Sequence, residues 1–174
     1  MLPRRFYTNT NAVKKVLDNE GLGKLSKVSL SLKCNKKRDY YVGWRAKKSE
    51  TGGGVLMSQT IHSIDQLVYM LSGITKPLRV KGKIGITRDY LEVEDEAEGL
   101  IEFSNGLIIK INATANAKEI WKGITEFHGE KGKIVLDSAK TKVWDIKDKI
   151  PIPSQEKENI PEKIKNKYYG PGHK

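Results

Sequence analysis

Residues 52–73, GGGVLMSQTIHSIDQLVYMLSG, join three consecutive glycines to an amphipathic helix, and the rest of the chain is organised around this helix. Glycines free the backbone for a tight turn, and their amides at the start of a helix are suited to binding an anion. Apolar residues between Ile61 and Leu71 recur at helical spacing. Because helix residues four apart share a face, Ser58, His62 and Gln66 are expected to form a polar row beside the apolar stripe.

Length and composition bound the class of protein. The 174 residues are 37% hydrophobic, which suits one domain that buries about 70% of its unfolded surface. No run of about 18 apolar residues occurs, and residues 1–5 lead into a polar segment, so we expect a soluble, cytoplasmic protein and no membrane partner. The single cysteine, Cys34, has no partner for an internal disulfide, which favours a reducing compartment and a role as a small strand hydrophobe.

The chain is strongly basic, with 32 lysines and arginines against 21 aspartates and glutamates and a formal net charge of +11. Such a charge attracts polyanions, anionic membranes and phosphorylated substrates at long range. The basic residues are spread along the chain, with local clusters only at 36–38 and 47–48. A solvated basic surface and a specific anion site therefore both remain open, whereas nucleic acid is an unlikely partner without a concentrated basic stripe.

Periodicity predicts the fold. A short helix containing Val13, Val16 and Leu17 precedes a strand at 25–33, in which apolar side chains alternate. Further strands are expected at 78–87, 91–103, 107–113, 124–128, 133–136 and 142–145, joined by turns such as 104–106 and 129–132. The pattern predicts an α+β fold: an open, mainly antiparallel β-sheet with helices covering one face.

One folded domain followed by an extended arm is expected. Residues 1–150 form the folded domain, and residues 151–174, interrupted by Pro151, Pro153 and Pro161, form an extended C-terminal arm. Between strand and helix, residues 35–54 are basic and aromatic and include Tyr40, Tyr41, Trp44 and Arg45. Aromatic and guanidinium groups can stack on a ring and pair with a carboxylate or phosphate, but a loop held on its own core would have the same composition. Both interpretations remain open.

The motifs of metal and nucleotide chemistry are missing. Five carboxylates fall within residues 92–98, but they lack a histidine and calcium-loop spacing, so a solvated strand edge is expected rather than a metal site. No phosphate-binding glycine-rich motif, HExxH or CxxC occurs, and we expect no metal or cofactor site in this chain. His62 is the candidate acid or base, because imidazole titrates near neutrality. A helix histidine bonded to its neighbours is the alternative.

Several segments in the same order resemble one family, the C-terminal domain of the Gfo/Idh/MocA oxidoreductases, named for glucose-fructose oxidoreductase and inositol dehydrogenase. They are Gly21-Leu22-Gly23-Lys24, Tyr40-Tyr41, Trp44-Arg45, the helix from Gly52 to Gly73, Val93-Glu94-Asp95, Phe103-Ser104-Asn105-Gly106 and Gly129-Glu130-Lys131-Gly132. The motifs Trp44-Arg45 and Gln59-Thr60-Ile61-His62 are most similar to those of dehydrogenases that act on nucleotide-linked aminosugar uronates.

The resemblance implies a function. Family enzymes hold NAD(P) on an N-terminal dinucleotide-binding domain with a catalytic lysine in a Glu-Lys-Pro motif, and both are absent from this sequence. The chain is therefore expected to be the isolated substrate-binding and oligomerisation domain of an NAD(P)-dependent sugar dehydrogenase, inactive alone. A companion chain would supply the cofactor domain, and the open sheet face would join copies into a homo-oligomer. A non-catalytic assembly or regulatory module that kept the fold is the alternative.

The resemblance also assigns roles by position. His62 corresponds to the substrate-facing histidine, which helps to remove the proton from a sugar hydroxyl. Arg45 and Tyr41 would meet the anionic part of the substrate, and Ser58 and Gln59 would contact the substrate beside His62. The family often has an aspartate at the position of Ser58, so a carboxylate-histidine pair is not implied here.

Overall fold

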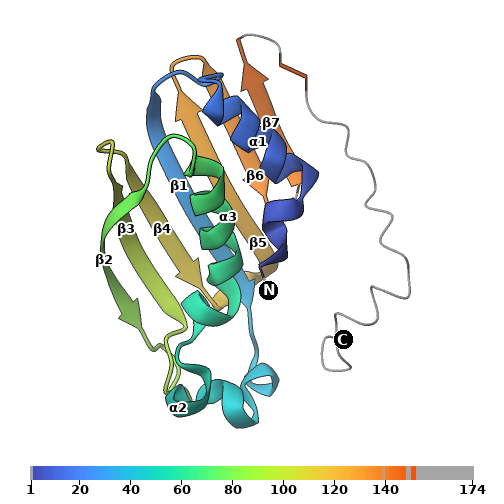
Figure 1. Ribbon diagram of the computed structural model, residues 1–174. Coiled ribbons are helices and arrows are strands. Elements are labelled where there is room, and N and C mark those ends of the chain that lie inside the picture. Colours follow the sequence, from blue (N-terminus) through green and yellow to red (C-terminus); the bar gives the residue numbers. More distant parts are fainter. Residues whose placement is uncertain (1, 139, 148–149, 152–174) are drawn as a thin grey trace.

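The computed structural model describes residues 2–138, 140–147 and 150–151. Seven strands form one open sheet in the order β2-β3-β4-β1-β5-β6-β7, and the helices cover one of its faces (Figure 1). The strands are β1 Leu25–Asn35, β2 Pro77–Gly85, β3 Glu96–Phe103, β4 Ile108–Thr114, β5 Asn116–Gly129, β6 Gly132–Asp137 and β7 Lys140–Ile146. The predicted α+β class with an open, mainly antiparallel sheet is confirmed. Nearly all of the predicted arm, 152–174, lies outside the described residues.

Strand β1 is the centre of the sheet. It pairs antiparallel with β5 and parallel with β4, which is the one departure from antiparallel pairing among the described strands. The parallel pair follows from the chain path, because the segment between β1 and β4 crosses over the sheet through the helices before it returns. Val28, Leu30 and Leu32 point to the helix side and are buried, as their alternation predicts.

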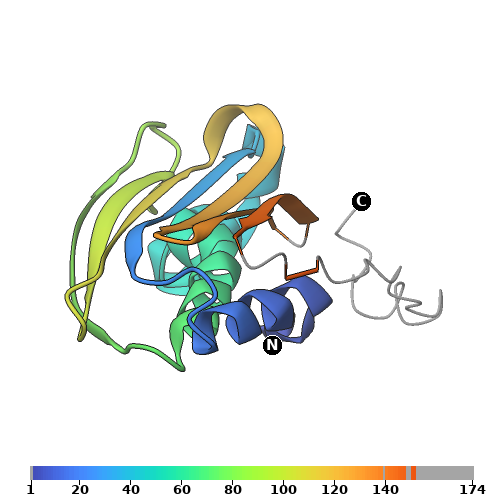
Figure 2. The same ribbon diagram turned by 90° about the horizontal axis from the view of Figure 1, so that it is seen from above.

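Two helices pack side by side over the sheet: α1 Thr8–Asp18 and α3 Ile61–Leu71. Figure 2 shows the sheet curving around them. The apolar stripe of each helix is buried against strand residues, because that is where the hydrophobic surface of both layers leaves water. The buried core comprises Val13, Val16, Leu17, Leu67, Met70 and Leu71 from the helices and Phe103, Ile109, Phe127 and Ile134 from the strands.

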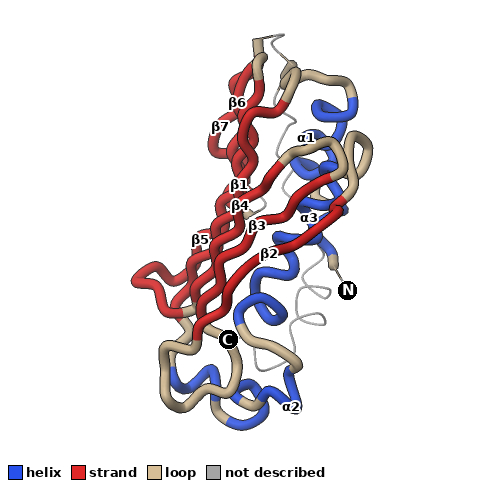
Figure 3. The backbone as a smooth tube through the Cα atoms, turned by 90° about the vertical axis from the view of Figure 1, so that its left-hand side faces the viewer, coloured by secondary structure: helices blue, strands red, loops and turns tan. Residues whose placement is uncertain are grey.

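Beyond one end of the sheet the chain makes several short helical turns (Figure 3). They are η2 Arg38–Tyr41, η3 Gly43–Ala46 and α2 Lys48–Thr51, where the sequence predicts an irregular loop. A π-helical turn, η4 Leu56–Thr60, leads directly into α3, and a 3-10 turn, η1 Pro3–Phe6, precedes α1. No helix in the described part of the chain has the length and apolar character needed to cross a membrane.

The predicted first residues of two strands are wrong. The strand expected at 91–103 begins only at Glu96, because residues 91–95 form bends whose polar groups bond to other segments. The strand expected at 124–128 begins at Asn116, because its backbone pairs with β1 as far as Cys34 opposite Trp121. Residues 116–122 show no clear alternation of apolar side chains, so this extension depends on pairing with β1.

Candidate functional site

The glycine-rich start of the helix is closed by one glutamate. The Glu94 carboxylate accepts hydrogen bonds from the Gly54 amide at 2.7 Å and from the Leu56 amide at 3.1 Å, and the Glu94 carbonyl accepts from the Val55 amide at 2.8 Å. A Cβ on Gly54 would lie 1.8 Å from the Glu94 carbonyl oxygen, so only glycine fits there. Glu94 thus caps the amides that the helix leaves free. Those amides have no free position for the anion suggested by the glycines.

The expectation of a solvated carboxylate edge is wrong for Glu94 and Asp95. Both are buried, and Asp95 is fully inaccessible. Asp95 accepts hydrogen bonds from the Thr87 amide at 2.7 Å, the Thr87 hydroxyl at 2.6 Å and Arg88 Nε at 2.8 Å. Burial alone would raise the pKa of Asp95, but these bonds and the guanidinium charge hold it below its ordinary value. In the described residues, no three His, Cys, Asp or Glu side chains gather to hold a metal ion.

Arg88 connects the buried Asp95 carboxylate to the basic aromatic segment, residues 35–54. Its guanidinium donates to the Lys36 carbonyl and, at 3.1 Å, to the Tyr41 hydroxyl, and its Cζ lies 4.9 Å from the Tyr41 ring centroid. Tyr41 is only 7% exposed, and burial raises the pKa of its hydroxyl to about 12. Tyr41 therefore holds the segment on the core and presents little surface to a ligand. Because Arg88 also bonds to the Lys36 carbonyl, its ion pair with Asp95 holds the start of the segment in place.

The predicted polar row along one helix face is wrong. Ser58 lies in the π-helical turn, is exposed, and donates to the Gly54 carbonyl at 2.7 Å. Gln66 is buried and donates to the Thr10 hydroxyl at 2.7 Å. His62 lies between these extremes, partly buried at the second position of α3. Ser58 leaves the row because the π turn changes the residue spacing ahead of α3, whereas His62 and Gln66 lie four residues apart within α3.

His62 has a polar atom that its surroundings leave unused. Its Nδ1 is buried and lacks a hydrogen-bond partner among the described residues. Burial, followed by the positive charge of Arg4, lowers the pKa of His62, and Asp65 acts in the opposite direction. The imidazole is therefore held in its neutral form near pH 7. A neutral, partly accessible imidazole can accept a proton.

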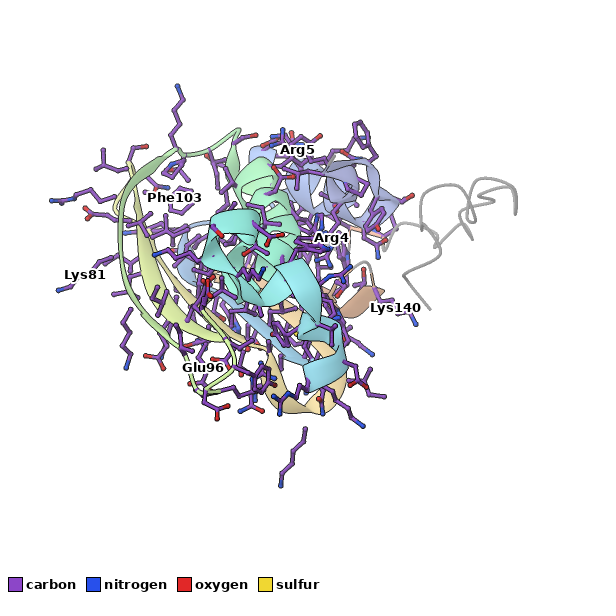
Figure 4. The ribbon with its side chains drawn as sticks, turned by 90° about the horizontal axis from the view of Figure 1, so that it is seen from below. Arg4, Arg5, Lys81, Glu96, Phe103 and Lys140 are labelled. Carbon is purple, nitrogen blue, oxygen red and sulfur yellow. The ribbon has the colours of Figure 1, made fainter. Side chains whose placement is uncertain are left out.

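Two arginines from η1 hold the first turn of α3. Arg5 Nε donates to both carboxylate oxygens of Asp65 at 3.0 and 2.9 Å, and Arg4 donates to the Ser63 hydroxyl at 2.6 Å. Figure 4 shows both arginines beside α3. Because Asp65 is already paired with Arg5, its charge is partly neutralised next to His62. The sequence pattern did not single out these arginines, since about 60 residues separate them from the helix.

Gln59 and Arg45 come together through Tyr40. Gln59 is buried in η4 and its amide donates to the Tyr40 hydroxyl at 2.8 Å. The Arg45 guanidinium lies 5.1 Å from the Tyr40 ring centroid and 4.8 Å from that of Trp44. The basic aromatic segment is thereby joined to the turn that immediately precedes His62.

Sequence reasoning missed two residues on this side of the molecule. The Lys36 ammonium lies 4.7 Å from the Tyr40 ring centroid and 5.8 Å from that of Trp121, which comes from β5. Lys36 was noted only as part of a basic cluster. Trp121 has no local signal, because it reaches Lys36 only through the long pairing of β5 with β1.

The fold places His62, partly buried at the start of α3, three residues after Gln59, whose amide bonds to Tyr40 of the basic aromatic segment. The family model described as the GFO/IDH/MocA C-terminal domain matches residues 10–135. The chain belongs to this family, and the resemblance noted from its motifs is confirmed.

Named relatives are oxidoreductases of sugars and related compounds. The chain is 25% identical, over an alignment of 197 positions, to levoglucosan dehydrogenase of Pseudarthrobacter phenanthrenivorans, covering 96% of this chain and 48% of the relative. It is 29% identical over 94 residues to 1,5-anhydro-D-fructose reductase of Ensifer adhaerens, covering 53% of this chain and 27% of the relative. The WlbA dehydrogenase of Bordetella pertussis, solved with NADH and UDP-GlcNAcA, superposes with a TM-score of 0.74 at 22% identity, covering 84% and 46%. The chain thus spans less than half the length of each.

Proposed function

We propose that this chain is the substrate-binding and oligomerisation domain of an NAD(P)-dependent sugar dehydrogenase that oxidises a CH–OH group. The observation that carries the proposal is His62, a neutral, partly buried imidazole whose Nδ1 lacks a partner among the described residues, three residues after the Gln59 that bonds to Tyr40 of the basic aromatic segment. In this role His62 accepts the proton of the sugar hydroxyl. Membership of the family and the names of the relatives support the same reaction class.

The cofactor belongs to another domain under this proposal. The one glycine-rich helix start of the described chain does not fit a dinucleotide pyrophosphate, because the Glu94 carboxylate already caps its amides. A negative carboxylate at that position repels a phosphate. A dinucleotide-binding domain outside residues 1–174, on a companion chain or a continuation of this one, would have to supply NAD(P).

The proposed substrate is a nucleotide-linked sugar with an acidic group. Arg45 is free of carboxylate partners among the described residues and lies next to Tyr40, which bonds to Gln59. A guanidinium in this setting is suited to a carboxylate or phosphate. Bordetella WlbA, whose fold the chain shares, was solved with UDP-GlcNAcA.

The test joins the chain to a dinucleotide-binding domain of the same family and follows formation of NADH with a panel of free and nucleotide-linked sugars. We expect turnover, and we expect His62→Gln to lower kcat at least about 100-fold, the usual scale for loss of a general base. His128→Gln is the matched control, since His128 lies on β5 beside Glu126. Turnover that survives His62→Gln would contradict the assigned role, and a joined protein that turns over none of the sugars would favour the non-catalytic assembly module.

A further inference from the structure

Five side chains next to the candidate site alternate between aromatic rings and cations, in the order Trp121, Lys36, Tyr40, Arg45, Trp44. We call them the cation–aromatic ladder. Lys36 lies between Trp121 and Tyr40, at 5.8 and 4.7 Å from the ring centroids. Arg45 lies between Tyr40 and Trp44, at 5.1 and 4.8 Å. The ladder joins residues from β5, the end of β1, η2 and η3.

The ladder is open to solvent at both ends. Trp44 is 51% exposed and Trp121 is 38% exposed, although indoles of this size usually bury most of their surface. The Trp121 ring is nevertheless oriented, because its Nε1 donates to the Ser138 hydroxyl at 3.1 Å. Two oriented, accessible indoles provide flat surfaces on which another ring can stack.

The two cations of the ladder lack carboxylate partners in the described part of the chain. Neighbouring basic residues do have them: Lys47 lies 3.3 Å from Glu50, and Arg88 lies 2.8 Å from Asp95. Lys36 and Arg45 lie over ring faces, which weakly compensate their charge. Their charge is therefore available to an anion that approaches the ladder.

The centre of the ladder is tied to the turn before His62. Tyr40 receives the hydrogen bond of Gln59, and Gln59 lies in η4 three residues ahead of His62. A ligand that serves both groups would have to extend from the ladder to the imidazole. Its ladder end would be planar and anionic, and its other end would carry the hydroxyl to be deprotonated.

We propose that the cation–aromatic ladder binds the nucleoside diphosphate part of a nucleotide-linked sugar, with the base on an indole and the phosphates at Lys36 and Arg45. The assignment rests on the proposed function for the sugar end. Base stacking on aromatic side chains tolerates different bases, so the ladder selects the nucleoside diphosphate more strongly than the identity of the base. The same groups would suit single-stranded nucleic acid, but three rings accommodate only a few bases.

The experiment uses this chain alone and needs no companion domain. Uridine diphosphate, uridine, inorganic diphosphate and a single-stranded oligouridylate are titrated by calorimetry at two salt concentrations. We expect uridine diphosphate to bind more tightly than uridine or diphosphate. We expect Lys36→Gln and Trp121→Ala each to weaken it about tenfold or more.

Matched controls come from the same chain. Lys81→Gln removes a lysine from exposed strand β2, and Trp144→Phe removes an indole on β7 whose Nε1 donates to the Ile150 carbonyl. Both should leave the affinity unchanged. Equal affinity in all variants, or no binding of uridine diphosphate at millimolar concentration, overturns the ladder assignment.

Two further outcomes separate the proposals. Oligouridylate binding that is tighter than that of uridine diphosphate and falls steeply with salt would assign the ladder to nucleic acid and overturn its role in nucleotide-sugar binding. If the joined enzyme oxidises free sugars through His62 while the chain fails to bind uridine diphosphate, the ladder assignment and the nucleotide-linked substrate fail, and the proposed sugar dehydrogenase activity stands. Binding of uridine diphosphate by a joined protein without turnover supports the ladder and contradicts the catalytic role.

Discussion

The protonation of His62 depends both on its own helix and on contacts from residues distant in the sequence. The sequence places it on the helix, but its surroundings come from η1, whose Arg4 donates to the neighbouring Ser63 at 2.6 Å. Arg5 meanwhile pairs with Asp65, the negative charge that would otherwise favour imidazolium. The two arginines thus act in the same direction, one by adding positive charge and the other by neutralising a carboxylate.

Replacing Arg4 with glutamine should raise the pKa of His62. The positive charge of Arg4 disfavours the protonated imidazole, so its removal should raise this pKa. NMR titration of the imidazole carbon signals measures it. Arg4→Lys keeps the charge and should keep the pKa of His62 low. An unchanged His62 pKa in Arg4→Gln would show that Arg4 only packs against α3.

The lowered pKa of His62 also has a consequence for stability. Because the folded pKa lies below the ordinary histidine value of 6.5, folding favours the neutral imidazole. This contribution is fully present above pH 6.5 and is lost as the pH falls through the folded pKa. His62→Gln should therefore lose less stability than the wild-type chain when the pH falls below 6.5, as measured by urea unfolding.

Secondary-structure elements could be predicted where buried apolar residues recur on one face. The alternation in β1 and the helical spacing from Ile61 to Leu71 each follow from a single buried face, and the glycine turn before β4 was visible because Gly106 takes a positive φ. The start of β3 was not predictable. The carboxylates ahead of it look solvated in sequence, yet Glu94 is bonded to amides 38 to 40 residues earlier. Nothing local to Glu94 distinguishes it from the exposed Glu92.

The same limit applies to the site. Arg45, Gln59 and His62 belong to motifs that can be recognised in the sequence. Arg4 and Trp121, in contrast, reach the site only through tertiary contacts. Ser58 belongs to a π turn that the helical spacing could not reveal. The polar residues near the helix could therefore be predicted from the sequence, whereas their supporting partners could be identified only from the fold.

The buried pair of Arg88 and Asp95 should set the stability of the basic aromatic segment. Arg88→Met leaves the inaccessible Asp95 carboxylate without its cation and removes the bonds to Lys36 and Tyr41, so unfolding should become easier by about 3 kcal/mol. Chemical denaturation measures the loss, and hydrogen exchange of amides 36–47 should accelerate.

Arg79→Met is the matched control for that change. Arg79 makes a similar ion pair with Glu102 at 3.0 Å, but the pair is exposed on the edge of the sheet and screened by water. Its loss should not measurably change stability. Equal effects of the two substitutions would mean that burial of the Arg88 pair does not matter.

At the scale of the whole molecule, the sheet presents one covered and one open face. On the open face β2 supplies Arg79, Lys81 and Lys83, and β3 places Glu102, Leu100 and Glu98 opposite them. Figure 4 shows Lys81 pointing away from the helices. A basic strand beside an acidic one is self-complementary, because a two-fold axis can lay the basic strand of one copy over the acidic strand of another.

We expect the open face to join copies into a homo-oligomer. Leu100 and Ile108 are exposed on that face, and their apolar surface would leave water in the interface. Size-exclusion chromatography with light scattering should give more than the mass of one chain, and Leu100→Lys with Ile108→Lys should reduce it to one. Val80→Lys is the control, because Val80 is equally apolar and exposed but shares the helix side with Ile101. Dissociation by Val80→Lys alone would place the contact on the edge of β2, and a chain that is monomeric at high concentration would contradict oligomerisation altogether.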